Sequence, residues 1–190
     1  LLSDTEMPVV AAALLAVGRL GDHEHESAIV HWLGSEDNEV FSAACVAATQ
    51  LELERARPLL RAAIVARDIP SQRRRRPVLI ALQTLADASL LPDLIEIARR
   101  LETSDACDPL VPAIQTALGD SPTSAQMDSV GVLLGDPSPH AQEVAAHVFS
   151  ARKYTKGLPA LRSLVADPKS GAVARAYACD GLREMKDAES

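Results

Sequence analysis

The sequence predicts an all-α fold, an α-solenoid built from about five to six stacked helix pairs. A short phrase recurs along the chain and closes on Asp4, Asp136 and Asp167. The last two aspartates are 31 residues apart, and the first two are 132 apart, which divides into four steps of 33. A period in the low thirties is typical of stacked supersecondary units. Hydrophobic residues make up 47% of the chain and aromatic residues only 3%. Ala, Leu and Val must therefore form a core of closely packed helices.

The first helix pair follows from the hydrophobic period of residues 5–33. The apolar residues on one face of the first helix, residues 5–19, are Val10, Ala13, Leu14 and Val17. We expect Asp4 to cap the start of this helix and Gly18 and Gly21 to end it. The apolar residues of a second, shorter helix are Ile29, Val30 and Leu33.

The later pairs repeat this plan. Asp37 is the expected cap of the second unit, whose first helix is lined by Val40, Ala43, Ala44 and Ala47 and whose second helix is lined by Ala56, Leu59, Leu60 and Ile64. Further units start near Arg74, Asp105, Ser138 and Ser170. Ser121 and Ser138 each place a capping hydroxyl before a helix-starting proline. The predicted units are 4–35, 36–70, 71–103, 104–136, 137–168 and a partial unit at 169–190, with about eleven helices and no strands.

Two stretches resemble a HEAT repeat of the bacterial bilin-lyase-like class. They are Val-Val-Ala-Ala-Ala-Leu-Leu-Ala-Val-Gly-Arg-Leu-Gly-Asp at 9–22 and Val-Ala-Arg-Ala-Tyr-Ala-Cys-Asp-Gly-Leu-Arg-Glu-Met-Lys-Asp at 173–187. Arg175 matches the motif arginine, whereas Ala11 and Phe41 stand at its place in the first two units. The resemblance implies a right-handed superhelix whose second helices line a concave, partner-binding face. Such families include scaffolds, bilin-attachment helpers and a few DNA glycosylases.

Neither end of the predicted stack carries a polar cap. Leu1 and Leu2 look like the tail of a missing helix, and the last unit has only its first helix. Exposed terminal repeats need polar outer faces. We therefore expect the chain to begin inside a longer array, with its ends in contact with further repeats or with a neighbouring molecule.

Charge is distributed in blocks along the chain. The net charge of −7 divides into −9 over residues 1–54, +6 over 55–100, −7 over 101–151 and +3 over 152–190. Arg73, Arg74, Arg75 and Arg76 are consecutive and precede Pro77. This run is either an anion site for phosphate, nucleic acid or an acidic peptide, or a solvated segment paired with acids of the flanking units. The acidic total and the scarcity of aromatic residues argue against nucleic acid.

Other polar clusters give weak signals. His23 and His25 share an acidic turn but lack a distant third ligand for a metal. His140, Glu143 and His147 lie along one helical face at spacings that favour surface polar residues. The three cysteines, which are expected to be buried reduced thiols, are Cys45, Cys107 and Cys179. No nucleophile elbow, phosphate loop or zinc motif is present. The sequence therefore predicts no catalytic residue, no metal site and no cofactor, and a protein that is not an enzyme.

We interpret the chain as a non-catalytic protein–protein interaction scaffold that binds through its second helices. The candidate partner-binding residues are His31, Trp32, Arg57, Arg61, Arg73, Arg74, Arg75, Arg76, Glu96, Arg99, Arg100 and Arg162. Arginine and Trp are enriched at binding hot spots, although the position of Trp32, three residues after Ile29, favours a core residue. The alternatives are an accessory subunit of a modifying enzyme, as among the bilin-lyase relatives, and nucleic-acid or phosphate binding through residues 73–76.

The expected compartment is the cytoplasm of a bacterium. No secretory signal opens the chain, and no apolar run reaches the length of about 18 residues that a membrane span needs. The partner is expected to be another protein of unknown identity, with no membrane insertion.

Overall fold

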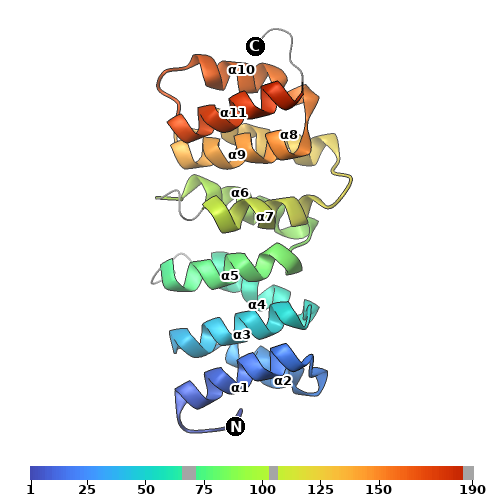
Figure 1. The fold of residues 1–190 in the computed structure, drawn as a ribbon, viewed down its shortest axis with the longest axis vertical. Coiled ribbons are helices and arrows are strands. Elements are labelled where there is room, and N and C mark those ends of the chain that lie inside the picture. Colours follow the sequence, from blue (N-terminus) through green and yellow to red (C-terminus); the bar gives the residue numbers. More distant parts are fainter. Residues whose placement is uncertain (66–71, 103–106, 186–190) are drawn as a thin grey trace. The chain divides into compact units, whose positions relative to one another are not determined.

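The computed structural model describes residues 1–65, 72–102 and 107–185, apart from the side chains of Gln72, Arg73 and Cys107. Within those residues the chain contains eleven α-helices and no strand (Figure 1). This confirms the predicted all-α fold class. None of the described helices is long and apolar enough to cross a lipid bilayer. The chain forms two compact units, Leu1–Ala86 and Asp87–Ser190.

Unit 1, residues Leu1–Ala86, alternates long and short helices. Its helices are α1 (Met7–Leu20), α2 (Glu26–Trp32), α3 (Asn38–Gln50), α4 (Arg57–Val65) and α5 (Gln72–Leu85). The long helices α1, α3 and α5 lie side by side, with α2 packed on α3 and α4 packed on α5 (Figure 1). The unit is therefore a stack of helix pairs, in which each long helix contacts the long helix of the next pair.

Unit 2, residues Asp87–Ser190, has the same plan. Its helices are α6 (Leu91–Arg99), α7 (Cys107–Leu118), α8 (Ser124–Gly131), α9 (Pro139–Arg152), α10 (Leu158–Ala166) and α11 (Ala172–Glu184). The long helix α9 packs between α7 and α11, and the short helix α10 packs on α11. A helix pair alone cannot bury its apolar face, so the neighbouring pair supplies the covering surface.

The short helices share one core position in all five cases. This position is filled by Ile29, Leu60, Leu94, Met127 and Leu161, which are 31, 34, 33 and 34 residues apart. Each of these side chains is at most 1% exposed. The turns before four of the short helices also repeat as single 3-10 turns: η1 (His23–His25), η2 (Glu54–Ala56), η3 (Ala88–Leu90) and η6 (Thr155–Gly157). The spacing of the recurring aspartates therefore matches the spacing of the helix pairs in the structure.

The recurring aspartates fold the loops that lead into the long helices. The Oδ1 atoms of Asp4, Asp136 and Asp167 each accept a hydrogen bond from the backbone N–H two residues later, at 3.0, 2.9 and 3.0 Å. This is the Asx turn, which aspartate favours because its short carboxylate reaches its own backbone. Asp37 accepts from two backbone N–H groups and caps α3 as predicted.

Two predicted caps are wrong. Glu6, not Asp4, is the N-cap of α1, because Asp4 uses its carboxylate on the N–H of Glu6 before the helix begins. Thr123, not Ser121, caps α8, where it forms a reciprocal capping box with Gln126. Ser138 caps α9 as predicted. The proline signal thus located the α8 start only to within two residues, because Thr123 also offers a hydroxyl.

Most predicted core residues are buried, with two corrections in unit 1. Gly18 does not end α1. It lies inside the helix, where an added Cβ would come within 2.8 Å of the Cα of Ala47 on α3. Gly21 ends α1 instead, with a left-handed backbone at φ 66° that glycine adopts without cost. Leu59 does not line the core, since it is 39% exposed while Leu60 is 1% exposed.

Candidate functional site

The candidate surface of unit 1 is the outer side of its two short helices. His31 on α2 is exposed and contacts the indole of Trp32 edge to face, with ring centroids 5.1 Å apart. Trp32 is half-buried, and its Nε1–H donates a hydrogen bond to the carbonyl of Leu2 at 3.1 Å. The indole therefore holds the N-terminal segment in place. Its use as a partner anchor remains a prediction.

Arg57 connects the short helix α4 to the long helix that follows it. Its Nε donates a 2.7 Å hydrogen bond to the carbonyl of Leu85, near the end of α5, and its Nη2 lies 3.7 Å from Glu54. Carbonyls at a helix C-terminus have no intrahelical donor, so this contact satisfies one of them. Arg61, one turn later, is exposed.

Arg74 is bound to the loop between α2 and α3. Its Nε donates to Asn38 Oδ1 at 2.7 Å, and its Nη2 donates to the carbonyl of Ser35 at 2.8 Å and to the carbonyl of Glu36. The guanidinium also lies over the ring of Phe41, 4.9 Å from its centroid, as in a cation–π contact. The arginine run is thus not a uniform anion site, because this member fixes one repeat to the next.

The remaining members of the run differ from one another. Arg76 is exposed and Arg75 is half-buried. The side chain of Arg73 lies outside the described residues. A phosphate or nucleic-acid site would need several of these guanidinium groups to converge on one anion. The Arg74 contacts turn one of them toward the preceding loop.

The unit 2 candidates form a cluster at the end of α6. Arg99 lies 3.4 Å from Glu96 and 3.3 Å from Asp136, while Arg100 donates to Glu96 at 2.6 and 2.9 Å. The hydrogen bond from Arg100 lowers the pKa of Glu96, with smaller contributions from Arg99. Arg162 on α10 is half-buried. Exposed pairs of this kind add little stability, but the Arg99–Asp136 pair joins α6 to the loop before α9.

Several polar contacts join residues about one repeat apart. They include Arg55 with Glu26 at 3.2 Å, Arg152 with the carbonyl of Gln115 at 2.6 Å, and Lys156 with Ser124 at 3.0 Å. Arg57, Arg74 and Arg99 belong to the same group. Long cationic side chains reach from one helix pair to the next, and these contacts account for five of the fifteen arginines of the chain.

An apolar stripe on α4 was missed by the sequence analysis. Leu59 and Val65 are 39% and 47% exposed, and Ala62 between them is exposed as well. Their spacing of three residues places them on one helical face. Exposed Arg61 lies beside this face, and Arg55, whose side chain is 68% exposed, precedes it. The signal was present in the sequence, but the same spacing also fits a buried face.

In the acidic turn, each of the two histidines pairs with a carboxylate of the same segment. His23 Nδ1 lies 2.8 Å from Glu26, and His25 Nδ1 lies 2.9 Å from Asp22. Within the described part of the chain no group of three His, Cys, Asp or Glu side chains is arranged to hold a metal ion.

The sequence predicted that the polar residues of α9 lie at the surface, and this prediction is wrong. Glu143 is only 7% exposed and lies 3.6 Å from His140. His147 stacks on Tyr177 of α11, with centroids 4.3 Å apart and planes 8° apart. Burial lowers the pKa of His147, while the charges of Glu143 and Asp108 act in the opposite direction.

The cysteines divide into two environments. Cys45 is buried, and burial raises the pKa of its thiol to about 12 despite the nearby Arg74 charge. Cys179 is exposed on α11, so the prediction of a buried thiol is wrong there. The side chain of Cys107 lies outside the described residues.

The described residues line a groove in each unit. The groove of unit 1, about 540 Å³, lies beside α1 and is lined mainly by apolar residues. The groove of unit 2, about 390 Å³, lies at the end of α7 and includes Asp120 and Arg152. Neither groove is lined by a cysteine, the residue that would suit the covalent attachment of a chromophore.

The solved structures that match this chain include a human enzyme. No family model matches the chain, and no curated protein matches it. The structure of human deoxyhypusine hydroxylase in complex with glycerol matches with 18% sequence identity and a TM-score of 0.49, over 97% of this chain and 71% of that chain. That protein is an all-helical HEAT-repeat protein. In its described residues the present chain is all-α and consists of stacked helix pairs.

The match corrects one prediction. The sequence predicted a protein that is not an enzyme, and the matched protein is itself an enzyme. We assign no reaction to the chain, since function depends on the site and not on the fold.

Proposed function

We propose that this chain is an interaction protein, a scaffold or adaptor, that binds a partner protein through the outer side of its short helices. The single observation that carries the proposal is the apolar stripe of α4: Leu59, Ala62 and Val65. The fold does not depend on apolar side chains at the solvent face of a helix, so they can be replaced without loss of structure. A contiguous set of them is a common feature of interaction sites.

The charges around the stripe define the kind of partner. Arg61 is exposed beside it, and Arg55, which pairs with Glu26, precedes it. Arginine pairs well with carboxylates. The fitting partner is an amphipathic helix with apolar residues at intervals of three and four and with acidic residues at its edges. Recognition of a helix through such anchors is a recurrent binding mode.

Phosphate or nucleic-acid binding by the arginine run is less well supported than protein binding by the stripe. Arg74 donates to Asn38 at the start of α3 and to the carbonyls of Ser35 and Glu36 in the loop before it. By contrast, the apolar side chains of the stripe are exposed to solvent.

The test compares two double variants in quantitative capture from extracts of the source cells. Leu59→Glu with Val65→Glu should reduce the retained partner about tenfold or more, because it places charge in the apolar contact. Ile80→Glu with Val132→Glu is the matched control, since both residues are exposed apolar side chains outside the stripe. Equal retention by the two variants, both folded by circular dichroism, would contradict the proposal.

A further inference from the structure

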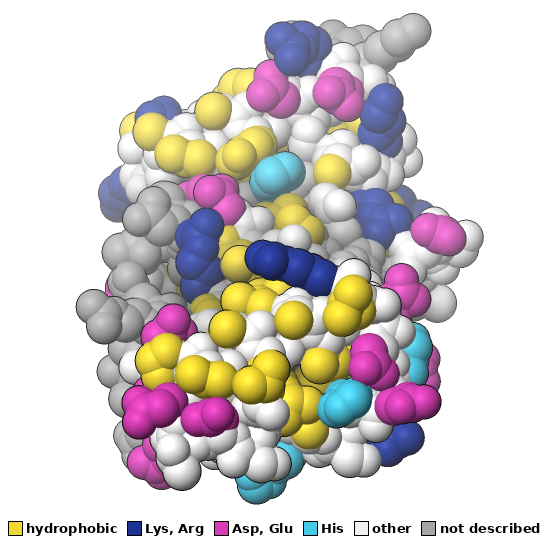
Figure 2. Space-filling model, turned by 60° about the horizontal axis from the view of Figure 1, so that its bottom comes forward, with side chains coloured by type: hydrophobic (Ala, Val, Ile, Leu, Met, Phe, Trp, Pro, Cys, Tyr) yellow, Lys and Arg dark blue, Asp and Glu magenta, His cyan; other side chains and the backbone are white. Residues whose placement is uncertain are grey.

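The groove of unit 2 lies at the C-terminal end of α7 and carries charged side chains, unlike the mainly apolar groove of unit 1. In unit 1, hydrophobic side chains gather in the lower half of Figure 2, with acidic side chains and histidines at their edges. The groove of unit 2, about 390 Å³, is lined by Pro112, Gln115, Thr116, Gly119 and Asp120 and by Arg152 of α9. This volume is within the range of small-molecule sites, so the two charged side chains define which ligand the groove suits.

A glycine at the end of α7 leaves this groove open. Gly119 has a left-handed backbone, with φ 64°, as do Gly21, Glu52 and Lys153 in the turns that follow α1, α3 and α9. A Cβ added at Gly119 would meet nothing within 4 Å. Two of the other helices place a long side chain at this turn, whereas α7 places none. The space beside the end of α7 is therefore open to a ligand.

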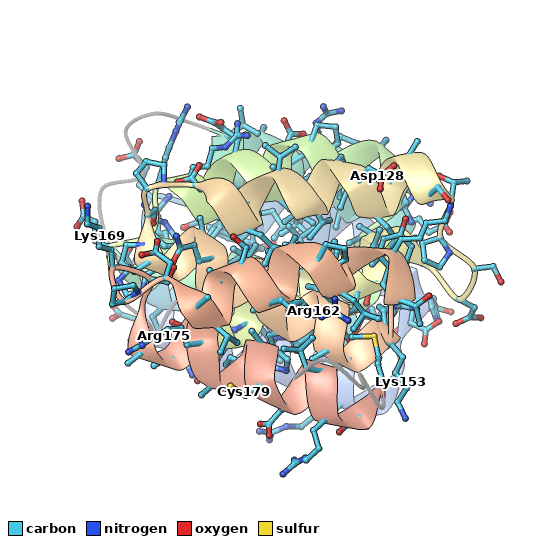
Figure 3. All side chains as sticks on the ribbon, turned by 90° about the horizontal axis from the view of Figure 1, so that it is seen from above. Asp128, Lys153, Arg162, Lys169, Arg175 and Cys179 are labelled. Carbon is cyan, nitrogen blue, oxygen red and sulfur yellow. The ribbon has the colours of Figure 1, made fainter. Side chains whose placement is uncertain are left out.

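Arg152 reaches the groove from the next long helix, α9. Its Nη2 donates a 2.6 Å hydrogen bond to the carbonyl of Gln115 on α7. Figure 3 looks onto unit 2 and labels Lys153, the residue after Arg152, at the end of α9. A guanidinium has five N–H donors, so the bond to Gln115 holds this side chain at the groove and leaves donors that suit a carboxylate.

Asp120 brings the opposite charge to the same groove. It is exposed, and among the described residues its carboxylate forms no ion pair, either with Arg152 or with another cation. It lies two residues after Leu118, the last residue of α7, where the helix macrodipole has its negative end. The carboxylate and the helix end both favour a positive group on this side of the groove.

We propose that this groove binds a small zwitterion, a free α-amino acid, with its carboxylate on Arg152 and its ammonium on Asp120. An α-amino acid carries both charges on one carbon atom, so it can bridge two opposite side chains that do not pair with each other. A simple anion would leave the Asp120 charge uncompensated, and a simple cation would leave the Arg152 charge uncompensated. This inference does not depend on the proposed partner site on α4.

Nuclear magnetic resonance of the isotope-labelled 190-residue chain tests the proposal, with glycine as the probe. Acetate and methylammonium each carry one of the two charges of glycine. Glycine should shift the backbone amide signal of Gly119 to saturation, and each single-charge probe should bind at least about tenfold more weakly, because one charged hydrogen bond is lost. Acetate or methylammonium binding as tightly as glycine, or no saturable shift with glycine, would overturn the zwitterion site.

Variants at the two charges make the test specific. Asp120→Asn and Arg152→Gln should each weaken glycine binding about tenfold. The matched controls, Asp180→Asn and Lys153→Gln, change exposed residues outside the groove and should bind glycine like the wild type.

The acidic variant decides the outcome if the arginine variant does not fold. Arg152 also holds Gln115, so circular dichroism must first show that Arg152→Gln is folded. Asp120 is exposed, and its substitution leaves the helices intact. Unchanged glycine binding in Asp120→Asn, or an equal loss in Asp180→Asn, would contradict the assigned ammonium position.

Discussion

Two long helices pack against each other in each unit, but with different side chains at the contact. The pair is α1 and α3 in unit 1, and α9 and α11 in unit 2. Both units place a glycine between two long helices that are in contact. Gly18 faces the backbone of Ala47, whereas a Cβ added at Gly181 would lie 3.1 and 3.2 Å from the Cβ and Cα of Ser150. The first contact is tighter, and Ala47 and the side chain of Gln50 are the groups of α3 that face Gly18. The second also holds the stacked rings of His147 and Tyr177.

The difference teaches that a repeat fixes the helix spacing but not the chemistry of the contact. Alanines fill a tight contact with methyl groups and leave nothing to titrate. A slightly wider contact admits aromatic and polar side chains. Unit 1 should therefore respond most to added volume, and unit 2 to pH.

The largest expected effect comes from adding one methyl group to each glycine. Gly18→Ala should lower the free energy of unfolding by about 2 kcal/mol, because overpacking against backbone cannot relax cheaply. Gly181→Ala should change it by less than about 1 kcal/mol, because the gain in helix propensity offsets a milder contact. Urea denaturation measures both. Equal losses for the two variants would show that the contacts are equally tight.

The next effect separates two neighbouring arginines. Arg74→Ala should cost about 1–2 kcal/mol, because it removes charged hydrogen bonds to the α2–α3 loop and the contact with Phe41. Arg76→Ala, at an exposed position, should stay within about 0.5 kcal/mol of the wild type. Thermal and urea unfolding compare them. An Arg76→Ala loss as large as that of Arg74→Ala would contradict the assigned contacts.

A smaller effect should follow pH in unit 2. Burial lowers the pKa of His147 below its ordinary value of 6.5, so the unfolded chain takes up this proton first as pH falls. Stability should therefore decrease from pH 7.5 to 5.5. In His147→Phe, which keeps the ring on Tyr177, the decrease should be smaller. The same pH dependence in both proteins would refute a contribution from His147.

The smallest effect concerns thiol reactivity and leaves stability unchanged. Cys179 should be alkylated rapidly in the native protein, because it is exposed. Cys45 should react only after unfolding, because it is buried and its pKa is about 12. Mass spectrometry of peptides reads each site separately. Native labelling of Cys45 at the rate of Cys179 would contradict its burial.

Local patterns predicted the helices well and the side-chain partners poorly. The buried position of Ile29 and Leu60 recurs because one helical face must contact the neighbouring helix. The spacing of apolar residues in the sequence shows this requirement. The partners of Arg74 are backbone carbonyls and an amide 36 to 39 residues away. No residue type marks a carbonyl, so this contact could not be predicted.

The candidate site shows the same limit. Leu59 and Leu60 are adjacent leucines, yet one is exposed and the other is buried. A short helix offers too few turns for hydrophobic spacing to fix its orientation. Glu143 was predicted to be solvated, because the sequence does not show that α9 is covered by helices on several sides.

Photocrosslinking from position 62 tests the central claim, protein binding by the α4 stripe, most directly. A benzoylphenylalanine placed at Ala62 should form one dominant protein adduct in the source cells, and Leu59→Glu should abolish that adduct. The same probe at Ile80 on α5 should not form it. No adduct from position 62, or the same adduct from both positions, would contradict the account.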